Sequence, residues 1–266
     1  MCTRLLCALC LISLVGCFSP VHVRPARTLA AGEHEVGVTL SGAALSADKV
    51  QWYNGTATDS IKDPTSASRF SGMPELVYHY GFMEDLEAGL RLAGGSGLAE
   101  ADAQYRLLRK RLGPGDLHLS AGAVVGSALA GETGGGRALV PVRATYDATE
   151  HWGVTLAGHA GYRWVKPAAV DPNLAVEHID ALRWLVASDG LTWGGGLSAD
   201  WRNDDWVARA FFETNWWSGD IGAQGKITTY GVMAMQFGLA VGFKFGKDAA
   251  ALRKSREDLD LLTTPK

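Results

Sequence analysis

The stretch WGVTLAGHAGYRW, Trp152 to Trp164, alternates apolar residues with small or polar ones along its whole length. Successive side chains of a β-strand point to opposite faces, so one face of this strand carries Trp, Val, Leu and Tyr, and the other carries Thr, His, Arg and small residues. The apolar face has to lie against a protein core or against lipid. Choosing between core and lipid therefore decides the fold class.

The same two-faced pattern recurs about ten times along the chain. The segments are Glu33–Ser41, Pro74–Tyr80, Leu86–Ala93, Ala99–Leu107, Asp116–Gly126, Arg137–Tyr146, Trp152–Trp164, Leu191–Trp201, Trp206–Trp216 and a last run from Ile227. Many of them are close to the ~9–11 residues that a tilted strand needs to cross a bilayer. No segment after the first 17 residues is apolar for long enough to cross a bilayer as a helix.

The connections between these segments differ in length in a regular way. Short ones at 81–85, 109–116, 147–151 and 202–205 alternate with longer ones at 46–73, 128–136, 165–190 and 218–226, and 94–97 is the one short exception. Short inner turns and longer outer loops are typical of an up-and-down membrane barrel. Within 165–190 two local structures remain open, a hairpin at Asp189-Gly190 or a short helix from Pro172.

Tryptophan spacing favours lipid over a protein core. At ~3.3 Å per residue and a tilt of about 40°, Trp152 and Trp164 stand roughly 30 Å apart along the membrane normal, and Trp206 and Trp216 about 25 Å apart. Both values are close to the ~25 Å apolar band of a membrane barrel, which carries aromatic girdles at its two edges. We therefore expect interface aromatics at Trp152, Trp164, Trp201, Trp206 and Trp216.

These features together resemble the small outer-membrane β-barrel proteins of Gram-negative bacteria. The resemblance covers 33–246 and rests on the alternation, the repeated turn pattern and the last strand, in which Gln236, Gly238, Val241 and Phe243 match the signal that such barrels present to the barrel assembly machinery. It implies an all-β, single up-and-down antiparallel transmembrane barrel in the outer membrane. The chain departs from the pattern in a charged tail, 247–266, for which we expect a short periplasmic helix.

The N-terminal segment has the pattern of a secretory signal peptide, with Arg4 followed by an apolar run. Leu14, Val15, Gly16 and Cys17 resemble the lipobox of bacterial lipoproteins, which implies cleavage after residue 16 and a lipid on Cys17, and Phe18 after the cysteine implies the outer membrane. All four cysteines lie at or before this point. An ordinary signal peptide with a chance cysteine is the alternative. Residues 17–32 are then a linker to the barrel at 33–246.

The faces opposite the apolar ones are rich in ionisable groups. The residues expected to line the lumen are Glu87, Arg91, Asp102, Arg106, His118, Arg143, His159, Arg163, Asp200, Arg209, Glu213 and Lys244. They form either a paired network that fills the interior or the wall of a narrow polar passage. An eight-stranded barrel is filled by its side chains and open channels need roughly 16 strands, so about ten strands favour a largely filled lumen.

The residue pattern also limits the function classes. The net charge of −3 and the absence of a basic cluster speak against a nucleic-acid partner. Glu177, His178 and Asp180 are the nearest approach to a catalytic group, but nothing nearby in the sequence supplies a nucleophile, and no metal or cofactor site is predicted. We expect a non-enzymatic barrel with a structural or surface-interaction role, its specific ligand unknown, that contacts outer-membrane lipid and presents the outer loops 46–72 and 165–190. The alternatives are a narrow porin or small-solute transporter and a soluble lipocalin-like periplasmic lipoprotein.

Overall fold

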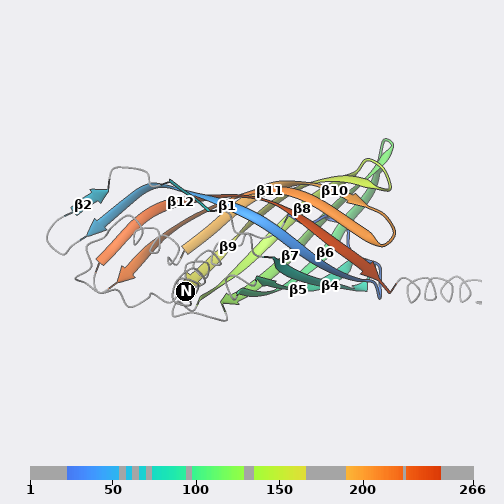
Figure 1. Cartoon of the computed structure of the whole chain (residues 1–266), viewed down its shortest axis with the longest axis horizontal. Coiled ribbons are helices and arrows are strands. Elements are labelled where there is room, and N and C mark those ends of the chain that lie inside the picture. The colour runs from blue at the N-terminus through green and yellow to red at the C-terminus, as the bar shows by residue number, and fades with distance from the viewer. Residues whose placement is uncertain are drawn as a thin grey trace, which may run out of the picture.

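The protein, described by a computed structural model, is a closed antiparallel barrel of ten strands (Figure 1). The structure describes residues 23–53, 58–61, 66–69, 74–93, 98–128, 135–165, 190–223 and 226–246. The barrel strands are β1 (His34–Tyr53), β4 (Glu75–Met83), β5 (Leu86–Ala93), β6 (Leu98–Leu112), β7 (Gly115–Ala128), β8 (Gly135–Asp147), β9 (Trp152–Val165), β10 (Gly190–Arg202), β11 (Trp206–Ala223) and β12 (Lys226–Phe245). The prediction of an all-β, up-and-down antiparallel barrel of about ten strands is confirmed.

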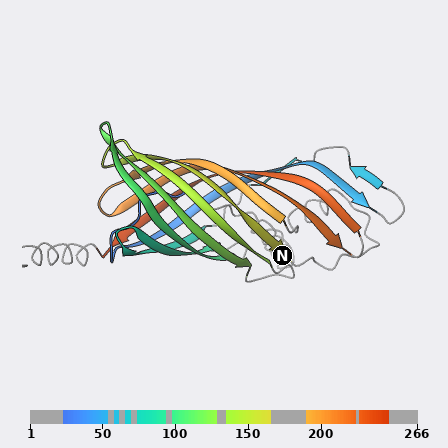
Figure 2. The same ribbon diagram turned by 180° about the vertical axis from the view of Figure 1, so that it is seen from behind.

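The barrel closes where the first strand meets the last. β1 and β12 pair in antiparallel fashion from His34 opposite Phe245 to Val50 opposite Tyr230, and the rings of His34 and Phe245 stack with centroids 4.8 Å apart. Seen from behind, the blue β1 and red β12 again lie side by side (Figure 2). Closure removes the two exposed edges that an open sheet would leave in lipid.

Four tight turns lie at one end of the barrel, which we call the turn end. They occupy 84–85, 113–114, 148–151 and 203–205, and β1 begins and β12 ends at the same end. Backbone bonds tie neighbouring turns to the barrel strands, with Arg202 N donating to His151 O at 2.8 Å and Lys244 N to Asp205 O at 2.7 Å. The β6–β7 hairpin is longer than predicted, because its strands continue to Leu112 and Gly115.

The opposite end, which we call the loop end, differs from the prediction. The expected loops at 46–73 and 218–226 are wrong in large part. β1 continues to Tyr53 and pairs with β2 (Thr58–Ile61) and β3 (Ser66–Arg69), and β11 continues to Ala223 opposite Lys226 of β12. Backbone groups beyond the membrane can continue the ladder without an alternating apolar face, so the hydrophobic pattern ended these strands too early.

The two faces of the barrel wall differ as the alternation predicts. In β9 the side chains of Trp152, Val154, Leu156, Tyr162 and Trp164 are exposed on the outside, whereas Thr155, His159 and Arg163 are buried inside. Trp206 is also exposed, and Trp201 and Trp216 are half-buried. Within the described ranges no helix is long and apolar enough to cross a membrane. Apolar groups outside and charges inside are the reverse of a soluble domain, so the outer face is suited to lipid.

Several predicted features lie outside the described residues. They are the signal peptide at 1–16, the lipid site Cys17, the candidate cluster Glu177, His178 and Asp180 in the loop at 165–190, and the tail at 247–266, so the expected helix in that tail is not supported. Residues 23–33, assigned from the sequence to a linker and the first strand, are described and lie against the inside of the barrel wall.

Candidate functional site

Residues 23–33, which we call the lumen segment, run along the inside of the barrel to the turn end. There the chain reverses direction and enters β1. Gly32 adopts a left-handed backbone with φ of 84°, and its N–H bonds Gly81 O at 2.8 Å while Gly81 N–H bonds Glu33 O at 2.9 Å. A Cβ on Gly81 would lie 2.1 Å from Ala30 O. The reversal therefore depends on a glycine in the turn and on a glycine in β4 that lets the segment approach closely.

Polar side chains of the wall hold the backbone of the lumen segment. Ala26 N donates to Thr145 Oγ1 at 2.6 Å, and the Gln104 side-chain amide donates to Pro25 O at 2.8 Å. Leu29 N donates to Glu87 Oε2 at 2.9 Å. Residues 23–31 belong to no strand and bend at Ala26 and Arg27, so these side chains replace the hydrogen bonds that a sheet would supply.

Arg24 places a positive charge between two carboxylates of the wall. Its guanidinium pairs with Glu87 on β5 and, at 2.5 Å, with Asp102 on β6. Burial lowers the pKa of Arg24, but the two carboxylates outweigh burial and raise that pKa above its ordinary value. Both contacts of the Glu87 carboxylate given by the structure, with Arg24 and with Leu29 N, come from the lumen segment.

Arg27 makes the second ionic contact at the turn end. Its Nη1 lies 2.6 Å from Asp147 Oδ1, and both oxygens of Asp147 also accept from Arg202 at 2.9 Å. Burial is the main reason why the pKa of Arg27 is lowered. Asp147, at the end of β8, therefore joins the segment to the rim of the barrel.

The contacts of the segment continue into a polar network across the wall. Arg143 Nη1 donates to Gln104 Oε1 at 2.6 Å, which fixes the amide that holds Pro25. Thr145 Oγ1 lies 2.8 Å from Thr155 Oγ1, and Thr155 in turn donates to Asp200 at 3.3 Å. Asp200 accepts from Arg209 Nε at 2.5 Å. The segment and the wall form one connected hydrogen-bonded unit.

Two further clusters lie toward the loop end. Glu100 pairs with Arg91 at 2.6 Å and with Arg137 at 2.5 Å. His159 Nε2 lies 2.5 Å from Asn215 Oδ1, and its Nδ1 lies 3.6 Å from Glu213. These groups fill the interior with ion pairs around Glu100 and with polar contacts around His159.

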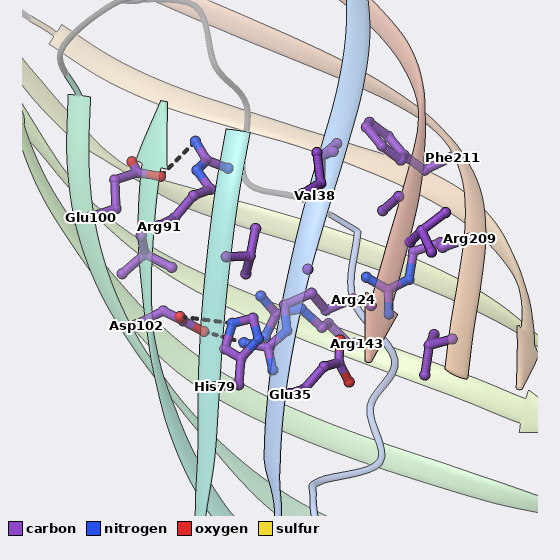
Figure 3. Close-up of a pocket in the computed structure, with 18 residues that line it drawn as sticks. Arg24, Glu35, Val38, His79, Arg91, Glu100, Asp102, Arg143, Arg209 and Phe211 are labelled. Carbon is purple, nitrogen blue, oxygen red and sulfur yellow. Dashed lines mark hydrogen bonds and ion pairs between the residues drawn. The ribbon is translucent and has the colours of Figure 1, made fainter. Parts of the chain in front are cut away.

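Little space remains beside Arg24. A cavity of about 50 Å3 is lined by Arg24, Glu35, His79, Asp102, Arg143 and Arg209, among others, and Figure 3 shows these side chains converging from several strands. Such a cavity holds a few water molecules, since one needs ~10–15 Å3 on this measure. Among the described residues no group of three metal-ligating side chains occurs.

The structure brings most of the predicted lumen residues into the interior. Glu87, Arg91, His118, Arg143, His159, Arg163, Asp200 and Glu213 are buried, and Asp102 and Arg209 are nearly so. Lys244 is half-buried near the turn end, opposite Glu35. Arg106 pairs with Asp85 of the first turn at 2.6 Å, so it braces the rim rather than the middle of the lumen.

The sequence reading missed the lumen segment and the residues that hold it. Arg24 and Arg27 carry no periodic pattern, because a segment without a strand partner leaves none. Gln104 and Thr145 lie on the polar faces of two predicted strands. Their side chains are neutral, so the sequence did not mark them as candidate site residues. The only available signal was a pair of arginines three positions apart beside prolines, which alone predicts no site.

Comparison with known proteins finds only distant structural likenesses. No protein-family model matches the sequence, and no curated protein matches it. Among solved structures, an outer membrane channel from Pseudomonas putida F1 is 12% identical with a TM-score of 0.40, covering 85% of this chain and 100% of that one. The outer membrane protease OmpT from Escherichia coli is 9% identical with a TM-score of 0.37, covering 83% and 99%. OprG from Pseudomonas aeruginosa is 13% identical with a TM-score of 0.34, covering 84% and 99%.

These TM-scores are below 0.5, and what each of these proteins does says nothing about this chain. The closed barrel with an apolar exterior and a charged interior is the architecture of Gram-negative outer-membrane proteins. The chain is an outer-membrane barrel protein.

Proposed function

We propose that the protein is a non-enzymatic outer-membrane barrel with a closed lumen, which acts structurally or through the loop-end segments 46–72 and 165–190 at the cell surface. The observation that carries the closed lumen is the lumen segment, whose residues Val23, Ala26 and Leu29 are buried inside the barrel. The ionic network and the small cavity of about 50 Å3 beside Arg24 support a lumen that is filled by side chains.

The contacts of the buried histidines support the proposed non-enzymatic role. His79 lies 3.4 Å from Asp102, His118 lies 3.3 Å from Asp147, and His159 lies beside Glu213 and Asn215. Each histidine is engaged by a carboxylate or amide within the network. Such pairing supports a structural use of these groups.

Conductance in planar bilayers tests the closed lumen. We expect the full-length protein, folded and inserted, to give a silent trace. A steady conductance that changes on Arg91→Ala or Arg143→Ala would support the narrow porin in its place. Gel mobility with and without boiling is the control, because a folded barrel migrates differently until it is boiled.

The proposed lipid on Cys17 would be a second membrane anchor in addition to the barrel. A Cys17→Ser variant is then expected to stay with the outer-membrane fraction, because exposed side chains such as Leu156 and Leu239 face lipid on their own. Release of that variant into the aqueous fraction would support the soluble lipocalin-like alternative. Mass measurement of the mature protein tests the lipid itself.

A further inference from the structure

We propose that Glu87, Asp102 and Asp147 form a binding site in the lumen for a peptide with two arginines three positions apart. The lumen segment occupies this site in the closed barrel with Arg24 and Arg27. When the segment is expelled, the site binds such a peptide from solution. The inference rests on the closed lumen of the proposed function, and it adds a ligand class to it.

One carboxylate of the site, Glu87, is contacted by the segment alone, and the other two are shared with groups of the wall. Glu87 is 1% exposed, and its contacts given by the structure come from Arg24 and Leu29. Asp102 on the adjacent strand has His79 as its other partner, at 3.4 Å. A buried carboxylate needs a cation, and a planar guanidinium can donate to two carboxylates at once. In Figure 3 Arg24 lies beside His79 and Asp102.

A second carboxylate position fixes the spacing of the arginines. Asp147 holds Arg27 at 2.6 Å while it also binds Arg202. The lumen segment bends at Ala26 and Arg27, between the two arginine contacts. The two carboxylate positions are therefore placed for two cations three residues apart in a chain that bends in this way.

The groups between the two carboxylate positions recognise backbone. Thr145 accepts from Ala26 N, and Gln104 donates to Pro25 O. The Gln104 amide is held in place by Arg143, and Thr145 by Thr155. These contacts favour a peptide over a small guanidinium compound, since a small compound would leave them unused.

Glycines of the wall give the segment its space. A Cβ on Gly196 of β10 would lie 2.6 Å from Val23 Cγ2, and one on Gly153 of β9 would lie 3.1 Å from Arg27 Nη1. With Gly81 of β4, these positions shape three sides of the site. The wall is fitted to a peptide at this place.

The test uses the full-length chain with Arg24→Glu and Arg27→Glu, which sets like charges against the site and expels the segment. The probe is a fluorescent synthetic peptide of residues 22–30, HVRPARTLA, followed by anisotropy in detergent. We expect it to bind this variant roughly tenfold or more tightly than the wild type, a difference of at least ~1.4 kcal/mol. A peptide with both arginines replaced by glutamine should not bind, and one with lysines should bind more weakly.

Two controls keep the result interpretable. Adding Glu87→Gln and Asp102→Asn to the variant should abolish binding while the mobility shift on boiling persists. If the charge-reversed chain does not fold, Arg24→Gln with Arg27→Gln, which removes the positive charges without adding negative ones, takes its place with the same expectation. Absence of binding to a folded variant, or equal binding of the glutamine peptide, would overturn the inference. Conductance of the wild-type protein would instead contradict the closed lumen, whether or not the peptide binds.

Discussion

Arg27 Nη1 lies 2.6 Å from Asp147 Oδ1, although 120 positions separate the two residues in the chain. The same carboxylate accepts two hydrogen bonds from Arg202 and lies 3.3 Å from His118. One side chain at the end of β8 thus joins the lumen segment, β7 and β10. Its loss affects the fold of the barrel rim and the position of the segment together.

Asp147→Asn is expected to destabilise the folded barrel by about 3–5 kcal/mol, because it leaves buried guanidinium groups without a counter-charge. Urea unfolding in lipid vesicles, followed by tryptophan fluorescence, measures the change. The matched control is Asp116→Asn, whose partner Arg109 is exposed at the adjacent hairpin. Loss of an exposed pair costs about 0–1 kcal/mol, so similar effects of the two variants would contradict a buried role for Asp147.

Gly81→Val is expected to expel the lumen segment without unfolding the barrel, because its Cβ cannot fit beside Ala30 O. Trypsin then cleaves after Arg27, a site that the wild type protects by burial. The fragment is read by mass spectrometry after timed digestion. Gly158→Ala is the control, since a Cβ there meets only Gly194 O, at 3.8 Å. Rapid cleavage of the wild type would show that the segment does not stay in the lumen.

The barrel was predictable from sequence because the alternation of apolar and polar residues is a local pattern. Each strand that crosses the membrane places apolar side chains toward lipid and polar ones toward the lumen. Leu156 and Thr155 show it most directly, one 60% exposed outside and the other fully buried inside. The strands were predicted only as far as the apolar face extends, so the loop-end parts of β1 and β11 were missed. Contacts such as Arg24 with Asp102 depend on how the closed barrel brings distant residues together, and no local pattern encodes them.

Leu156→Arg tests whether the outer face meets lipid. The residue lies near the middle of β9 on the outside, where an arginine is expected to destabilise the inserted barrel by about 2–4 kcal/mol. Urea unfolding in vesicles gives the value. Glu150→Arg, in the exposed turn before the same strand, is the control and is expected to change stability little. An unchanged stability of Leu156→Arg would mean that this face lies in water.

Phe243→Ala tests the proposed use of the last strand by the assembly machinery. Phe243 matches the assembly pattern, and its ring also packs against Trp206 with centroids 5.1 Å apart. Loss of an aromatic pair costs only about 0.5–1.5 kcal/mol, so the purified variant should still refold in vesicles. In cells, however, we expect less folded protein in the outer membrane, measured by the fraction that shifts on boiling.

Leu239→Ala on the same strand removes an exposed apolar side chain outside the pattern and serves as the control. Equal losses in cells for the two variants would assign the effect to lipid contact, whereas a loss confined to Phe243→Ala, with normal refolding in vesicles, would separate recognition during assembly from stability.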